Sequence, residues 1–126
     1  MQTIKLLVYS CGLYSFAFAI FHLLFWRLFD WKNDLKKLTV ANRAIIQIFN
    51  LRLIYFFLLV GFICFLFPTD LISTSFGRFF LAGISLFWLG RTIEQFIFLR
   101  VKHKGVHLLT VIFIIGTILF ALPLFF

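Results

Sequence analysis

Residues 41–52 read Ala-Asn-Arg-Ala-Ile-Ile-Gln-Ile-Phe-Asn-Leu-Arg, and they carry polar side chains into a stretch that is otherwise apolar. At about 3.6 residues per helical turn, Arg43, Gln47 and Asn50 share one face of a helix. Arg52 points roughly the opposite way. Because polar groups are costly in hydrocarbon, they need partners there. The stretch therefore predicts a membrane-spanning helix with one polar face.

The composition is typical of an integral membrane protein. Of 126 residues, 63% are hydrophobic and 13% are charged, 21 are Phe, and the mean hydropathy is +1.11. A soluble domain has about 45–50% apolar and about 25% charged residues. The formal net charge of +8 does not indicate nucleic-acid binding, because the chain has neither zinc-finger spacing nor a soluble basic domain. We expect a single domain over residues 1–126.

Four apolar stretches are each long enough to cross a bilayer, which takes about 20 helical residues. They predict an all-α, integral membrane four-helix transmembrane bundle with spans over residues 4–29, 43–67, 76–100 and 106–125. Residues 28–38 have apolar positions at helical spacing among charged ones: Leu28, Trp31, Leu35 and Leu38. This segment predicts an amphipathic helix at the membrane interface, with a solvated loop as the alternative.

Single residues predict where helices begin and end. Pro68 should end the second span, because proline cannot continue the helical hydrogen-bond ladder cheaply. Thr39 is placed to cap the start of that span. The first span lacks the short apolar region and cleavage site of a signal peptide, so we expect it to remain uncleaved. Cys11 and Cys64 are expected to be small buried thiols, although a disulfide between them is conceivable.

The basic residues predict the orientation in the membrane. Eight Lys and Arg lie in the hairpins that join spans one to two and three to four, whereas Lys5 and Arg78 alone lie on the opposite side. Because cytoplasmic loops are enriched in Lys and Arg, both hairpins should be cytoplasmic and both termini outside. The membrane would be the inner membrane of a bacterium or an endoplasmic reticulum type membrane of a eukaryote.

Polar side chains on all four predicted spans fall in the cytoplasmic halves. At about 1.5 Å of rise per residue, Arg52 and Arg91 both lie roughly 13 Å below the surface. Glu94 can neutralise either arginine, and we expect a buried ion pair between Arg52 and Glu94. The remaining cations favour an anionic guest, because guanidinium groups match carboxylates and phosphates bidentately. The predicted ligand-binding residues are Arg43, Gln47, Asn50, Arg91, Glu94, Gln95 and His107, with His22 and Thr110 nearby on the other spans.

The ligand of such a cluster would be a glutathione-like peptide or a lipid head group. A salt-bridge network that merely locks the bundle is the alternative. A metal or haem site is less favoured: His103, His107 and His22 could supply ligands, but Gly105 interrupts the helix between the first two and no second acidic group accompanies them. We therefore expect no metal. A proton-coupled transporter is also disfavoured, because neighbouring arginines would keep Glu94 ionised.

Short motifs in this chain resemble those of the MAPEG family, the membrane-associated proteins in eicosanoid and glutathione metabolism. Asn42-Arg43 with Asn50 is similar to the family's Glu-Arg…His-x-Asn signature, and Gly90-Arg91 with Glu94 and Phe98 is similar to its third helix. In this chain Asn and Phe replace the family's glutamate and tyrosine.

The resemblance implies a homotrimer that holds glutathione between subunits near the cytoplasmic face. Arg43, Asn50 and Arg91 would bind the anion, and Glu94 would orient an arginine. The implied activity is that of a glutathione transferase or peroxidase acting on lipophilic substrates. The competing hypothesis is a non-enzymatic accessory or scaffold subunit that packs against a larger membrane complex, as well as against membrane lipids.

Overall fold

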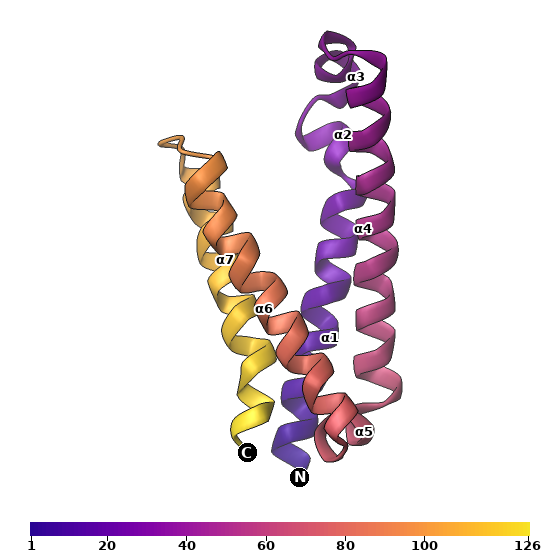
Figure 1. Cartoon of the computed structure of the whole chain (residues 1–126), viewed down its shortest axis with the longest axis vertical. Helices are drawn as coiled ribbons and strands as arrows, with labels where there is room; N and C mark the ends of the chain where they lie inside the picture. Colours follow the sequence, from indigo (N-terminus) through magenta and orange to yellow (C-terminus); the bar gives the residue numbers. More distant parts are fainter. The chain divides into compact units, whose positions relative to one another are not determined.

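The structure is a computed structural model that describes residues 1–126, and it is all-helical, without strands. Figure 1 shows the elements in chain order. They are α1 (Gln2–Leu23), α2 (Phe25–Leu28), α3 (Trp31–Asp34), the 3-10 helix η1 (Leu35–Lys37), α4 (Val40–Leu66), α5 (Pro68–Ser73), α6 (Ser75–Phe98), α7 (Lys104–Ala121) and the 3-10 helix η2 (Leu122–Phe125).

Three helices are long and apolar enough to cross a membrane: α1, α4, and α7 continued by η2. This finding supports the prediction of a membrane protein. The fourth long helix, α6, has 24 residues but is more polar, because Arg78, Arg91 and Glu94 lie along it. Its crossing of the membrane, and with it the four-span bundle, stays a prediction.

The chain divides into two compact units, and each is described by itself. Residues 12–63 form the hairpin unit, and residues 1–11 with 64–126 form the C-terminal unit.

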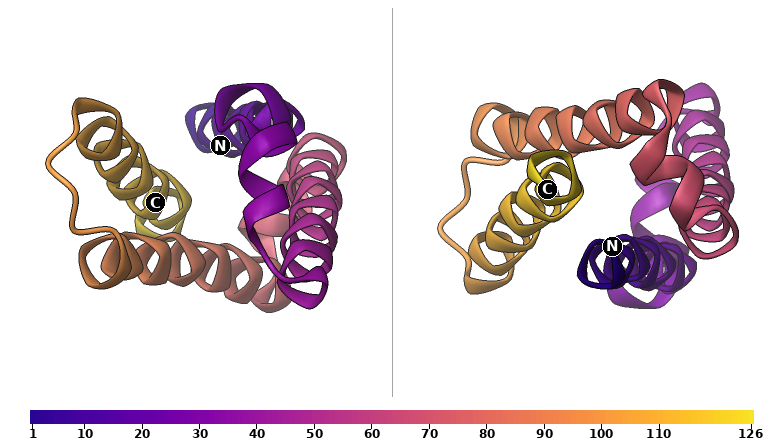
Figure 2. Two further views of the ribbon diagram at one scale, coloured as in Figure 1. Left: turned by 90° about the horizontal axis from the view of Figure 1, so that it is seen from above. Right: turned by 90° about the horizontal axis from the view of Figure 1, so that it is seen from below.

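In the hairpin unit, α1 and α4 lie side by side (Figure 1 and Figure 2). Aromatic rings pack between the two helices. The ring centroids of Phe18 and Phe57 are 5.7 Å apart, and those of Phe16 and Phe62 are 5.2 Å apart in an edge-on arrangement. Gly61 permits this approach, because a Cβ atom there would lie less than 3 Å from the Phe16 ring. A larger residue at this position would require the Phe16 ring to shift.

In the C-terminal unit, α6 packs antiparallel to α7, and the loop over residues 99–103 joins them (Figure 2). The Trp88 and Phe113 rings are stacked, with centroids 5.7 Å apart. The hydroxyl of Ser85 donates to the carbonyl oxygen of Thr117 at 2.7 Å. Apolar stacking and interhelical hydrogen bonds therefore hold this pair of helices together.

The predicted helix ends at both sides of α4 are confirmed. Thr39 Oγ1 accepts from the Asn42 backbone N–H at 3.4 Å, and α4 ends at Leu66, shortly before Pro68. Pro68 then occupies the first turn of α5, where its missing N–H costs nothing. The sequence analysis did not predict this short helix.

Residues 28–38 are helical, but they do not form the continuous helix predicted for them. Asp30 has a φ of 51°, in the left-handed region that Asp tolerates better than most residues, and it separates α2 from α3. The first span is also shorter than predicted, since α1 ends at Leu23 rather than near Phe29. The predicted apolar face is partly protected, because Leu35 is buried and Trp31 and Leu38 are half-buried, whereas Leu28 is exposed.

Candidate functional site

The Arg43 guanidinium is half-buried and bonded to its own hairpin. Its Nε donates to the carbonyl oxygen of Leu35 at 2.8 Å, and one terminal nitrogen donates to that of Leu38 at 3.1 Å. A weaker bond of 3.5 Å reaches Lys36. Arg43 therefore bonds to carbonyl groups where η1 ends, a role typical of arginine at helix C-termini, and the Leu35 carbonyl also accepts from the Leu38 backbone N–H. These bonds use donors that a bound anion would need.

Asn50 is buried and forms two hydrogen bonds with one residue of α1. Its Nδ2 donates to the His22 carbonyl oxygen at 3.1 Å, so its Oδ1 faces the imidazole. The His22 Nδ1 lies 2.8 Å from that oxygen. Because the amide oxygen only accepts, His22 must carry a proton on Nδ1. One helical turn earlier, Gln47 Nε2 donates to the Arg43 carbonyl oxygen at 3.1 Å.

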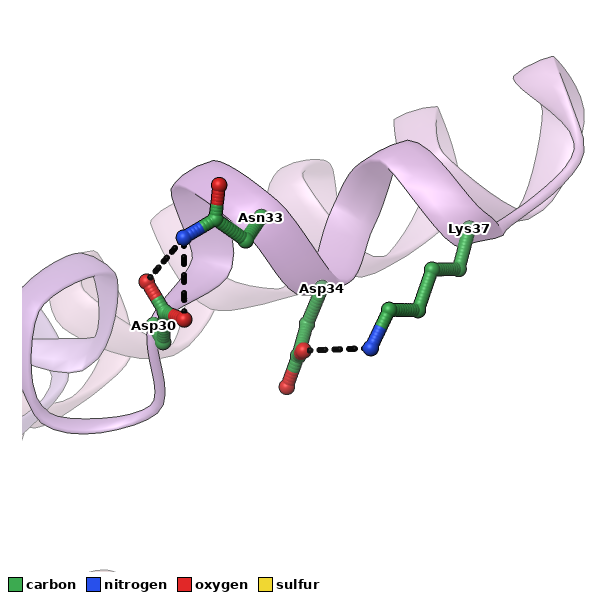
Figure 3. Close-up of polar contacts among 4 residues, drawn as sticks. All are labelled: Asp30, Asn33, Asp34 and Lys37. Carbon is green, nitrogen blue, oxygen red and sulfur yellow. Dashed lines mark hydrogen bonds and ion pairs between the residues drawn. The ribbon is translucent and has the colours of Figure 1, made fainter.

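The tip of the hairpin unit is stabilised by its own polar side chains. Asp30 accepts from Asn33 Nδ2 with both carboxylate oxygens at 3.1 Å, and Lys37 lies 3.4 Å from Asp34 (Figure 3). The last pair is exposed, so it contributes little to stability. The Asp30–Asn33 contacts hold the left-handed turn at Asp30.

The two arginines predicted at one depth each lie against an aromatic ring. The Arg91 guanidinium carbon is 4.5 Å from the centroid of the Phe113 ring, and that of Arg52 is 5.8 Å from the Tyr55 ring. Such cation–π contacts stabilise a guanidinium, and Arg91 is also attracted electrostatically by Glu94. Glu94 is exposed. Arg52 and Glu94 belong to different units, so the ion pair expected between them stays a prediction.

Gln95 is the predicted site residue with an unsatisfied polar atom. Its side chain is 2% exposed, and its Nε2 donates to the carbonyl oxygen of Val106 at 3.2 Å, across the α6–α7 contact. Its Oε1 is buried and has no hydrogen-bond partner. Thr110 does not supply one, because its hydroxyl donates to the same Val106 oxygen at 2.9 Å. A buried acceptor without a partner is uncommon in native proteins and indicates a missing ligand or water.

Gln95 lies in the wall of a half-open cavity of about 270 Å³ at the end of the α6–α7 pair, which we call the basic groove. Its lining residues are Gln95, Phe96, Leu99, Arg100, Val101, Lys102, Val106, His107 and Thr110. The surface is mainly apolar, and Arg100, Lys102 and His107 bring cationic or titratable groups to it. Its volume is near the lower limit of about 300 Å³ for small-molecule sites.

The structure brings together Gln95 and His107 of the predicted residues, and it adds Thr110. Arg43, Gln47 and Asn50 lie together on α4 in the hairpin unit, where they bond to backbone and to His22. Arg100 and Lys102 were not among the predicted site residues, although both belong to the eight basic residues counted in the two hairpins. That cluster of basic residues beside an amphipathic helix end was the available signal.

Comparison with protein families, with curated proteins and with solved structures finds no match to this chain. The resemblance to the MAPEG family therefore stays a prediction, as do the trimer and the glutathione site.

Other groups with reactive side chains serve the fold. His103 caps α7, with its Nδ1 accepting from the Gly105 backbone N–H at 3.0 Å. No group of three metal-ligating side chains is assembled. Cys11 and Cys64 are free and buried, as expected, and Cys11 Sγ contacts the Leu119 carbonyl oxygen at 3.4 Å.

Proposed function

We propose that this chain is an integral membrane protein of four spans that binds an anionic amphiphile in the basic groove, with the groove on the cytoplasmic side. The observation that carries the proposal is the combination of Arg100, Lys102 and His107 with an apolar cavity wall at Gln95. Cationic groups attract a negatively charged head, and the apolar wall accepts the hydrocarbon attached to it.

The position of the groove in the chain supports the same proposal. Arg100 and Lys102 follow α6, at the end of the helix where a cation is favourable, and α7 begins at Lys104. Cytoplasmic leaflets carry anionic lipids, and the excess of Lys and Arg in this loop favours the cytoplasmic side. A lipid head group is therefore the nearest abundant anion. Glutathione, the ligand implied by the MAPEG resemblance, is the soluble alternative.

Native mass spectrometry of the full chain in detergent tests the proposal. We expect phosphatidylglycerol to bind more tightly than phosphatidylcholine with the same acyl chains. The double variant Arg100→Ala/Lys102→Ala should weaken phosphatidylglycerol binding about 30-fold, since each basic residue near anionic lipid contributes about 1 kcal/mol.

The matched control removes the same charge elsewhere. Lys36→Ala/Lys37→Ala lies in the hairpin unit, outside the groove, and should leave the affinity within about twofold. An equal loss in both double variants would show that net charge, and not the groove, attracts the lipid. The same spectra report the number of copies in the complex, which tests the predicted trimer.

A non-enzymatic scaffold remains the competing function, and one observation favours it in the hairpin unit. Arg43 and Asn50, which the resemblance assigns to anion binding, are occupied by backbone carbonyls and by His22. Purification with a stoichiometric partner protein, together with unchanged lipid binding in the Arg100→Ala/Lys102→Ala variant, would support the scaffold.

A further inference from the structure

We propose that the anion bound in the basic groove also carries a hydrogen-bond donor, which pairs with Gln95 Oε1. This inference rests on the proposed function and narrows it to a class of ligand. Lipids with hydroxyl-bearing phosphodiester head groups have this chemistry, and so does glutathione with its amide N–H groups.

The orientation of the Gln95 amide follows from its partner. The Val106 carbonyl oxygen can only accept, so the nitrogen of the amide must face it, as the 3.2 Å contact shows. The other amide atom is then an oxygen, an acceptor that is buried without a partner. Leaving such an atom unpaired costs free energy, because it has lost water and gained nothing.

The protein supplies no hydroxyl for this acceptor. Thr110, which shares the groove, already donates to Val106. Gln95 is one of the residues that line the basic groove, so a molecule bound in the groove is the nearest source of a donor for Oε1. A water molecule in the same place would also satisfy the oxygen.

The charges around the groove restrict what can bring the donor. Arg100, Lys102 and His107 favour an anion and disfavour an ammonium group among them. An ethanolamine head group would place its N–H donors on a cation, and choline has no N–H donor. A phosphodiester with a free hydroxyl combines a negative charge with a neutral donor.

Two lipids of equal charge separate this inference from the proposed function. Phosphatidylglycerol and phosphatidylmethanol, with the same acyl chains, both carry a phosphodiester anion, but only the first has hydroxyl donors. Native mass spectrometry of the full chain should show about 3–10-fold tighter binding of phosphatidylglycerol, the contribution of a typical hydrogen bond. In Gln95→Met the two lipids should bind equally, whereas the exposed Gln2→Met control should keep the preference.

Each result has one meaning. Equal binding of both lipids by the unchanged protein overturns the inference, with water as the partner of Oε1, and leaves the proposed function standing. This comparison needs no variant, so a folding defect in Gln95→Met does not affect it. Binding of neither lipid, nor of glutathione in a parallel titration, overturns both proposals. Binding of glutathione but of neither lipid, lost in Gln95→Met and kept in Gln2→Met, supports the inference and identifies a soluble peptide as the ligand.

Discussion

At the residue scale, three polar side chains differ in how completely the chain satisfies them. Arg43 donates to backbone carbonyls of the hairpin, and Asn50 both donates to and accepts from His22. Gln95 satisfies its nitrogen but not its oxygen. A polar side chain whose hydrogen bonds are made within the chain has a structural role. A buried acceptor without a partner, beside a cavity, indicates a bound ligand. The sequence alone places all three in the same class of polar residue.

Asn50→Leu should destabilise the protein by about 1 kcal/mol, a typical cost for an interhelical hydrogen bond in a membrane protein. The change removes both bonds to His22 and leaves the Nδ1 proton without its acceptor. Unfolding in mixed detergent micelles, followed by circular dichroism, measures the loss.

The matched control for this prediction is Asn42→Leu. Asn42 is exposed near the start of α4, so its replacement should change stability by less than about 0.5 kcal/mol. If the two variants lost stability equally, the Asn50–His22 hydrogen bonds would contribute no specific stability to the fold.

At the element scale, a side-chain cap and a close approach of two backbone segments decide where α6 begins. Thr74 caps α6 by accepting from the Gly77 backbone N–H at 2.9 Å. A Cβ atom at Gly77 would clash with the Asp70 carbonyl oxygen and with the backbone of Leu71. The backbone cannot move aside as a flexible side chain can. The junction of α5 and α6 therefore depends on the absence of a side chain at this position.

Gly77→Ala should destabilise the protein by about 1–3 kcal/mol, the range for forcing extra atoms into a packed contact. Gly83 is a matched control on the same helix, because a Cβ atom there meets nothing within 4 Å. Gly83→Ala should be neutral or stabilising by up to about 1 kcal/mol, since alanine is the better helix former. The unfolding assay used for Asn50 distinguishes the two, and equal effects would contradict the close approach of α5.

At the scale of the whole molecule, the number of spans depends on α6. The chain has three helices long and apolar enough to cross a membrane, and α6 is long enough but carries Arg78, Arg91 and Glu94. With four spans, both termini of the chain lie on one side of the membrane. With three, they lie on opposite sides. The excess of basic residues in the first and last hairpins favours four.

Cysteine labelling tests this arrangement in a background where Cys11 and Cys64 are replaced by alanine. Single cysteines at the exposed positions Lys36, Thr69 and Lys102 report the three loops. With four spans, a membrane-impermeant maleimide should label Thr69→Cys in intact cells. It should label Lys36→Cys and Lys102→Cys only after the membrane is permeabilised. Labelling of Thr69→Cys and Lys102→Cys from the same side would show that α6 does not cross.

The sequence by itself determined that the chain is helical, that its composition is typical of a membrane protein, and that Thr39 and Pro68 flank the helix α4. These properties are local, because hydropathy, proline and capping residues act within a few positions along the chain. The break at Asp30 was missed, since a left-handed residue inside an amphipathic pattern depends on the turn that surrounds it.

Only the tertiary structure decided which polar groups are satisfied. Asn50 bonds to His22, 28 positions away, and Gln95 bonds to Val106, 11 positions away on the next helix. Periodicity predicts the face on which a side chain lies, but it does not specify the rotation and distance of the neighbouring helix. The rotation and distance of the neighbouring helix determine whether a hydrogen bond forms. At Gln95 they allow a bond from Nε2 and leave Oε1 unpaired beside the basic groove.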